Sequence, residues 1–209
     1  MYKNLFKRII DFSAALIGLI LLFPIIFLIS LILFFTYKGN PFFFQPRPGK
    51  NEKIFNIIKF KSMTDKKDEN GDLLPDYKRI TPIGTFIRKY SLDELPQLIN
   101  VFIGHMSLIG PRPLRVRYLP FYTIEEGIRH TVKPGVTGLA QVSGRNLLSW
   151  DEKLKIDIKY VNEITFLLDL KILFLTIKKI LSPQGIELNP NTLNFDEYRM
   201  QKNKINSTN

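Results

Sequence analysis

Two adjacent carboxylates, Asp93 and Glu94, are the residues in this sequence whose types and spacing are best suited to chemistry. They lie in the segment SLDELPQLIN, with Ser91 three positions before Glu94 and an apolar run after the pair. This spacing is typical of a capping box, in which the serine and the glutamate close the first turn of a helix. A carboxylate pair can equally act in group transfer, with one member as nucleophile. The local sequence alone favours the structural interpretation.

The position of Pro96 changes where that helix is expected to begin. With Ser91 as N-cap, Pro96 would be the fifth helical residue, where its missing N–H breaks a backbone hydrogen bond. With Asp93 as N-cap, Pro96 is the third helical residue, where the N–H is free anyway. We therefore predict a helix over residues 93–102 that Asp93 opens. Its carboxylate would lie at the positive end of the helix dipole, which favours the ionised form that a nucleophile needs.

Basic residues in three further segments are candidates for binding an anion. Pro111 and Pro113 fix the backbone around Arg112, which lowers the entropy lost on holding a ligand, although a solvated arginine on a rigid turn is an equal alternative. Lys59 belongs to a Lys-Phe-Lys run, and such a run usually forms a solvated strand face. In the loop VKPGVTGLAQVSGRN, Arg145 could bind phosphate beside Asn146. Loops of this composition are more often simple turns.

The composition narrows the classes of partner and of site. The 209-residue chain has 30 Lys and Arg against 19 Asp and Glu, a net charge of +11 that favours anionic partners such as phosphate groups or a membrane surface. No nucleic-acid partner is expected, because the basic residues are scattered. The absence of cysteine excludes disulfides and thiolate metal sites. The two histidines lack metal-ligand spacing, and no Walker A, GxSxG or GxGxxG motif occurs.

An uncharged apolar segment, residues 12–37, is long enough to cross a bilayer and too long for a signal peptide. Pro24 lies near its middle and predicts a kink. Basic residues flank the segment on both sides, and such residues prefer the cytoplasmic side of a membrane. A re-entrant helix that bends at Pro24 satisfies both flanks, whereas a kinked single span satisfies one. From the residues alone the two topologies are equally good.

The remaining elements predict an α+β fold in three parts. Residues 1–38 form the membrane-embedded part, residues 39–185 a compact, mostly helical domain outside the membrane, and residues 186–209 a polar tail that we expect to be loose. Two Phe- and Ile-rich runs on either side of Gly49 predict a small β-hairpin. A polar loop over 64–78, helices over 84–90, 150–163 and 167–181, and a strand in MSLIGPRP follow. The helix over 167–181 is apolar on several faces and either enters the core or lies on the membrane surface as an amphipathic helix.

Several segments together resemble the bacterial sugar transferases, the small monotopic phosphoglycosyl transferases of the PglC type. These segments are KRIIDF, KFKSM, LDELPQLINV, MSLIGPRP and PGVTGLAQVSGRN, in the order and spacing of that family. The resemblance covers about residues 7–181. It implies a membrane-bound enzyme of the bacterial cytoplasmic membrane whose catalytic domain faces the cytoplasm, and it favours the re-entrant helix.

The resemblance also implies a reaction and roles for named residues. Family members move a sugar 1-phosphate from a UDP-sugar to undecaprenyl phosphate with Mg²⁺ and release UMP, which is the first membrane step of glycan assembly. Asp93 is then the nucleophile and a metal ligand, and Glu94 has a supporting role. Lys59, Arg88, Arg112, Arg145 and Asn146 would bind the substrates, because a phosphoryl group needs charge neutralisation. Downstream glycosyltransferases would be further partners.

Two positions depart from the family pattern. Many members have Ser-Pro at the helix break, where this chain has Phe23-Pro24, and many have an acidic residue in place of His105. Neither change touches the carboxylate pair. The alternative function is that of a non-enzymatic membrane protein that binds anionic lipid or a partner through its basic face.

Overall fold

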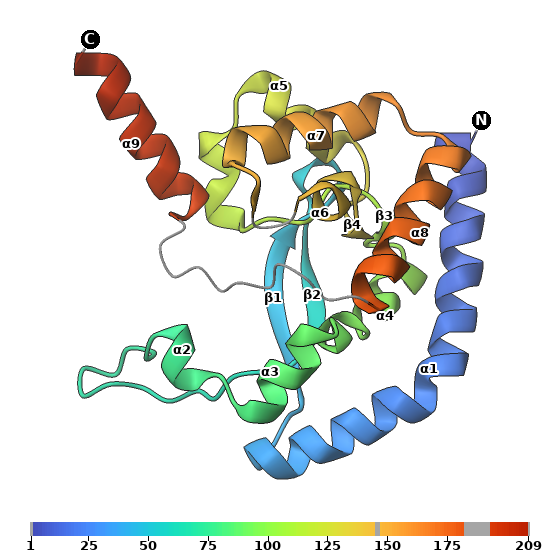
Figure 1. The fold of residues 1–209 in the computed structure, drawn as a ribbon, viewed down its shortest axis with the longest axis vertical. Helices are drawn as coiled ribbons and strands as arrows, with labels where there is room; N and C mark the ends of the chain where they lie inside the picture. The colour runs from blue at the N-terminus through green and yellow to red at the C-terminus, as the bar shows by residue number, and fades with distance from the viewer. Residues whose placement is uncertain (1, 145–146, 182–192, 209) are drawn as a thin grey trace.

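The structure is a computed structural model that describes residues 2–144, 147–181 and 193–208. A short π-helical turn, Tyr2–Phe6, leads into helix α1 (Lys7–Tyr37), which is apolar and mostly exposed (Figure 1). Among the described residues, α1 is the one helix long and apolar enough to cross a membrane. The protein is therefore a mixed helix-and-strand fold with an exposed apolar helix at its N-terminal end.

The buried residues of α1 form two pairs, Asp11 with Ala15 and Ile29 with Leu33, on either side of Pro24. Each pair is spaced by one turn, so its members lie on one face of the helix. Ala15 packs into one core cluster, whereas Ile29 and Leu33 pack into another. The ribbon of α1 changes direction along its length in Figure 1. Both halves of the helix therefore contact the rest of the protein.

The predicted β-hairpin is confirmed. Strand β1 (Phe42–Pro48) pairs antiparallel with β2 (Ile54–Phe60), and a 3₁₀ turn, Lys50–Glu52, connects them. Alternation along β2 buries Phe55 and Ile57 on one face.

A second, parallel pair of strands lies at the centre of the fold. Strand β3 (Ser107–Ile109) was predicted, but its partner β4 (Gly135–Thr137) lies in a segment predicted to be a loop. A Cβ atom added at Gly135 would lie 2.1 Å from the backbone nitrogen of Gly110, so glycine is needed for the two strands to meet. The same glycine that suggested a turn therefore permits close strand pairing.

Helices surround these strands, and the predicted helices over 84–90, 150–163 and 167–181 are confirmed with small shifts of their ends. The described helices after α1 are α2 (Asp76–Arg79), α3 (Pro82–Lys89), α4 (Gln97–Phe102), α5 (Ile124–Gly127), α6 (Leu139–Ser143), α7 (Trp150–Asn162), α8 (Phe166–Leu181) and α9 (Phe195–Thr208). A core cluster between the central strands and helices α6, α7 and α8 includes Ile109, Tyr160 and Ile172.

Helix α8 buries one face and exposes an apolar face. Asp169 and Ile172 are buried, and Asp169 forms an ion pair with Lys7 of α1 at 2.6 Å. The exposed apolar residues of α8 include Phe166, Leu167, Leu170, Phe174, Ile177 and Leu181. Figure 1 shows α8 beside the first half of α1. The sequence left open a core or a surface position for this helix, and the structure places it on the surface of the core with its outer apolar face uncovered.

Helix α9 corrects the expectation of a loose C-terminal tail. Phe195 at its start is fully buried, and its ring packs against the rings of Tyr118, Tyr122 and Trp150. Phe195 therefore anchors the start of a largely polar helix, and Arg199 and Lys202 add ion pairs with Glu126 and Asp151.

Candidate active site

The carboxylate pair lies in a 3₁₀ turn, Leu92–Glu94, that precedes α4. The prediction that Asp93 caps a helix is wrong, and no capping box forms at Ser91 either. Ser91 has a φ of 56°, in the left-handed region, and separates α3 from this turn. Backbone bonds from Glu94 to Ser91 and from Leu95 to Leu92 then form a tighter turn than an α-helix. A proline follows, and α4 begins only at Gln97, so its dipole is not centred on Asp93.

Glu94 is held by two cations that come from distant parts of the chain. Its Oε1 accepts hydrogen bonds from Lys59 Nζ at 2.7 Å and from Arg112 Nη2 at 2.8 Å. Lys59 lies on β2, and Arg112 lies on the turn that follows β3. Burial opposes ionisation of Glu94, but the charges and hydrogen bonds of Arg112 and Lys59 outweigh it and hold the pKa of Glu94 well below its usual range. Glu94 is thus a fixed anion.

Asp93 stands in a different environment from its neighbour. Among the described residues, its half-buried carboxylate accepts no hydrogen bond, although Lys59, Arg88 and Arg112 act on it by their charges. Burial, followed by the charge of Glu94, raises the pKa of Asp93 to about 6. Two neighbouring carboxylates whose pKa values are moved in opposite directions indicate two different roles. Among the described residues, neither oxygen of Asp93 accepts a hydrogen bond, whereas Oε1 of Glu94 accepts two.

The structure brings together five of the seven residues predicted for the site, namely Asp93, Glu94, Lys59, Arg88 and Arg112. Arg88 extends from α3, and its buried Nη1 has no hydrogen-bond partner in the described part of the chain. A buried donor without an acceptor is a position where an anionic ligand can bind. Arg145 and Asn146 lie outside the described residues.

Arg47 is a basic residue of the site that sequence reasoning did not assign to it. It occupies Pro46-Arg47-Pro48 at the end of β1, the same tripeptide that surrounds Arg112. Burial and the charges of Arg112 and Arg115 lower the pKa of Arg47 to about 10, and its buried Nε has no partner in the described residues. The repeated Pro-Arg-Pro tripeptide was the signal that could have identified it.

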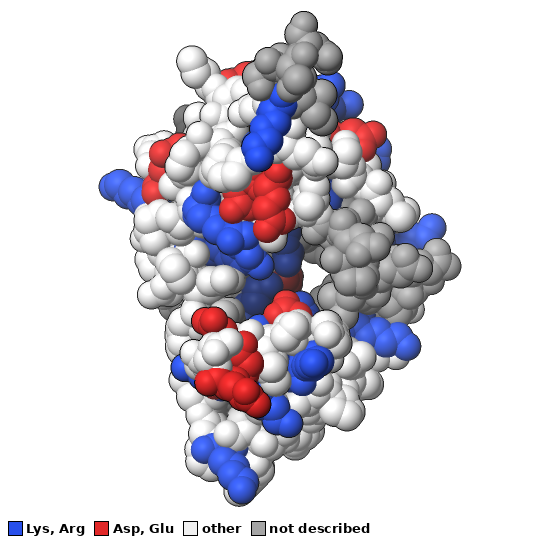
Figure 2. All heavy atoms as spheres, turned by 90° about the vertical axis from the view of Figure 1, so that its left-hand side faces the viewer, with Lys and Arg blue, Asp and Glu red and all other residues white. Residues whose placement is uncertain are grey.

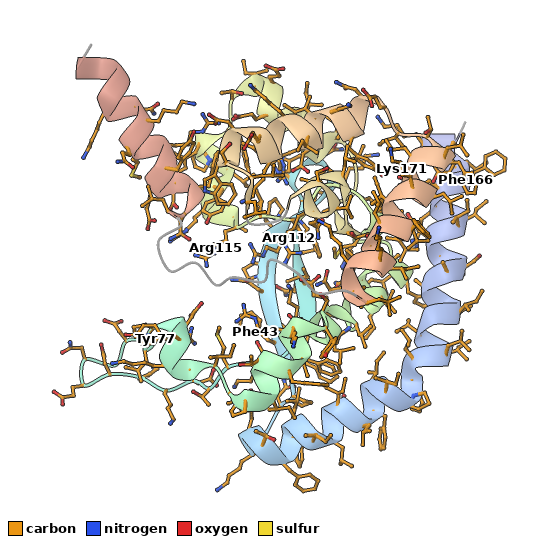
Figure 3. All side chains as sticks on the ribbon, viewed as in Figure 1. Phe43, Tyr77, Arg112, Arg115, Phe166 and Lys171 are labelled. Carbon is orange, nitrogen blue, oxygen red and sulfur yellow. The ribbon has the colours of Figure 1, made fainter. Side chains whose placement is uncertain are left out.

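Lys and Arg side chains line an open hollow on one face of the protein (Figure 2). Figure 2 shows a hollow near the middle of one face, with Lys and Arg inside it and acidic side chains around it. Figure 3 labels Arg112 and Arg115 beside the hairpin, between α9 and the region of α2 and α3. An open cationic hollow suits a ligand with several negative charges.

Arg129 is a second residue missed by sequence reasoning, and it fixes the turn that carries Arg112. Its Nη2 donates to the backbone oxygen of Arg112 at 2.6 Å and to Asp157 Oδ2 at 2.8 Å. Arg129 and Asp157 are almost completely buried. The ion pair therefore ties Arg112 to α7, a connection that no local sequence pattern reveals.

The comparisons with known proteins identify the family of the chain. The model of the bacterial sugar transferase family matches residues 2–183. The uncharacterized sugar transferase EpsL of Bacillus subtilis (strain 168) is 50% identical over 182 residues, which cover 87% of this chain and 90% of EpsL. An undecaprenyl-phosphate glucose phosphotransferase of Komagataeibacter xylinus is 40% identical over 83% of this chain and 35% of that protein.

A third relative, the UDP-glucose:undecaprenyl-phosphate glucose-1-phosphate transferase of Klebsiella pneumoniae, is 39% identical over 83% of this chain and 40% of that protein. The chain thus spans almost the whole of EpsL but less than half of the other two relatives. With a family model that matches nearly all of its length, the chain belongs to the bacterial sugar transferase family.

Proposed function

We propose that this protein transfers a sugar 1-phosphate from a UDP-sugar to undecaprenyl phosphate and releases UMP. The observation that carries the proposal is the pair formed by Asp93, which has free oxygens, and Glu94, which is fixed by Lys59 and Arg112. The names of the Komagataeibacter and Klebsiella relatives support undecaprenyl phosphate as acceptor, and the name of the second supports a UDP-sugar as donor.

The proposed reaction has two displacement steps at one phosphorus atom. A carboxylate oxygen of Asp93 attacks the sugar-bearing phosphorus of the donor, the bond to the bridging oxygen breaks, and UMP leaves with the electron pair. A phosphate oxygen of the lipid then attacks the same phosphorus and releases the Asp93 carboxylate with the polyprenyl diphosphate sugar as product. Lys59, Arg88 and Arg112 lie where they can neutralise the phosphate charges.

Magnesium is part of the proposal. The described residues contain no cluster of three or more His, Cys, Asp or Glu side chains able to hold a metal. Mg²⁺ commonly binds through one or two carboxylates together with substrate phosphates and water, so Asp93 and a diphosphate make a suitable set. Glu94 is less suited, because Lys59 and Arg112 occupy one of its oxygens. When bound, the ion would offset the diphosphate charge and stabilise the departing UMP.

We also propose that α1 is re-entrant, bends at Pro24 and keeps the catalytic domain on the cytoplasmic side. The contacts of both halves of α1 with the same domain support this topology, because a straight span would carry one half away from it. The chain has no cysteine, so single cysteines introduced near Lys3 and near Lys50 can be labelled with an impermeant thiol reagent in intact cells. Neither position should react, and labelling of either from outside would contradict the re-entrant helix.

The enzyme is distinguished from a passive lipid-binding protein by intact-mass measurement. Purified protein is incubated with Mg²⁺ and a panel of UDP-sugars, and we expect a phosphosugar adduct and UMP release with at least one sugar. Asp93→Asn should remove both, whereas Asp72→Asn in the exposed loop over 64–78 should remove neither. UMP release that persists in Asp93→Asn would exclude Asp93 as the nucleophile.

A further inference from the structure

A second cationic cavity lies near the start of α1, apart from the site at Asp93. It has a volume of about 270 Å³, and none of its lining residues belongs to the candidate active site. Five basic residues contribute to its wall: Lys3, Lys7, Arg8, Lys50 and Lys133. Asp11 is the one acidic residue that lines it, so the cavity has a large excess of positive charge.

Three of the five cations already have partners inside the protein. Arg8 donates to the backbone oxygens of Val101 and Phe102, at 2.7 and 2.8 Å. Lys7 forms an ion pair with Asp169, and Lys3 donates to a backbone oxygen of α7 at 3.3 Å. These contacts hold the N-terminal end of α1 against the domain.

Lys50 and Lys133 differ from the other three. In the part of the chain that the structure describes, neither forms an ion pair or donates a hydrogen bond from its side chain. Burial, together with the charges of Arg8 and Lys50, lowers the pKa of Lys133, although Asp11 opposes this effect. A half-buried ammonium group is therefore surrounded mainly by like charge, and a bound anion would relieve this repulsion.

The neutral polar groups of the wall are already engaged. Ser107 Oγ donates to the backbone oxygen of Ile109, and Tyr160 donates to the same oxygen and to Asp169. Thr131 Oγ1 donates to the backbone oxygen of Ile128. A ligand in the cavity would therefore meet positive charge and free ammonium N–H donors, and few neutral groups with a free hydrogen bond. A compact group with several negative oxygens fits this chemistry better than a neutral sugar or a base.

We propose that this cavity binds a phosphate group through Lys50 and Lys133, with Lys3 and Arg8 adding to its field. Lysine is a point charge that suits phosphate oxygens. The cavity lies where α1 begins, and the exposed apolar surface of α1 follows directly. A lipid headgroup and a free phosphate compound both carry the required group. The proposal does not depend on the reaction at Asp93.

The test measures binding to the full-length protein in two arms. In the first, protein in neutral detergent is titrated with inorganic pyrophosphate by calorimetry. In the second, protein in nanodiscs of phosphatidylcholine with phosphatidylglycerol is analysed by native mass spectrometry for retained anionic lipid. Lys50→Gln with Lys133→Gln should weaken binding at least about tenfold in one arm. Lys50→Arg with Lys133→Arg, which keeps both charges, should restore most of it.

A matched control separates a built site from general attraction to anions. Lys171→Gln with Lys178→Gln removes two exposed lysines from α8 and should leave binding unchanged. Loss in the pyrophosphate arm assigns a soluble phosphate compound, and loss in the lipid arm alone assigns a headgroup. Equal loss in both lysine pairs overturns the proposal. The proposal is also overturned if Arg112→Gln abolishes pyrophosphate binding while the cavity variants change neither pyrophosphate binding nor lipid retention.

Discussion

Replacement of Glu94 by Gln should move the acidic limb of the pH–rate profile to lower pH. In the wild type, the ionised form of Asp93 is the proposed nucleophile, and its pKa is raised to about 6 by burial first and by the charge of Glu94 second. The fraction ionised therefore falls as pH falls through 6, and the rate at pH 5 should be about one tenth of the rate at pH 7. The variant removes the negative neighbour and leaves the two cations in place.

The size of the shift follows from the interaction of two like charges. At an effective dielectric constant of 20, two charges about 6 Å apart interact by about 3 kcal/mol, which corresponds to about two pKa units. Lys59 and Arg112, freed from Glu94, would favour ionised Asp93 further. Relaxation and solvent reduce the effect, so we expect the limb to move down by about one to two pH units. The variant should then keep about one half to nine tenths of its own pH 7 rate at pH 5.

The assay is the initial rate of UMP release at donor concentrations far below KM, which reports kcat/KM and therefore the free enzyme, with each protein normalised to its own value at pH 7. Normalisation matters because loss of Glu94 also disturbs Lys59 and Arg112 and lowers the absolute rate. Glu69→Gln in the exposed loop over 64–78 is the matched control and should keep the wild-type profile. A limb that stays at pH 6 or rises in the Glu94 variant would refute the assignment of Asp93 as the group that titrates.

Three further predictions concern stability. The pKa of Asp93 in the folded protein lies above its ordinary value, so the protein loses stability at this group as pH rises from about 4 to 6. Asp93→Asn should therefore raise the free energy of unfolding by about 1–3 kcal/mol at pH 7, and by less at pH 5. Thermal unfolding measures this change, and a destabilised variant would contradict the prediction. Gly135→Ala should cost on the order of 3 kcal/mol or prevent folding, because its Cβ would collide with the backbone of Gly110, the residue after β3. Gly127→Ala, with open space around it, should be tolerated in the same assay. Arg129→Met should lower the free energy of unfolding by about 3–5 kcal/mol, because it leaves Asp157 buried without its partner. Adding Asp157→Leu should recover part of that loss. An unchanged denaturation midpoint in the single variant would count against the buried ion pair.

Local sequence patterns were enough to predict the hairpin and the long helices, whose formation depends mainly on neighbouring residues. The hairpin on either side of Gly49 was predicted from two apolar runs broken by turn residues, and the helices α7 and α8 were predicted with nearly the observed ends. The turn at Asp93 was mispredicted, because Ser91 adopts a left-handed backbone conformation that is uncommon for residues other than glycine.

Contacts between distant segments could not be predicted in the same way. The carboxylate pair and Arg112 were identified as candidates, but the ion pair that joins Glu94 to Lys59 depends on how the hairpin packs against α4. Arg129 resembles any surface arginine in sequence and is buried only because Asp157 meets it from α7. Such positions are set by tertiary packing, which no local pattern encodes.

The bonds from Arg8 to the last carbonyls of α4 have a mechanical consequence. These carbonyls belong to the last two residues of the helix, and Arg8 of α1 donates to both, in addition to the backbone bond that Val101 O accepts from Gly104. The carboxylate pair precedes the other end of the same six-residue helix. Helix α4 thus connects α1 to the site: Arg8 of α1 binds its C-terminal end, and the carboxylate pair lies just before its N-terminal end. An anchor seated in a bilayer would hold Asp93 at a constant height above the lipid.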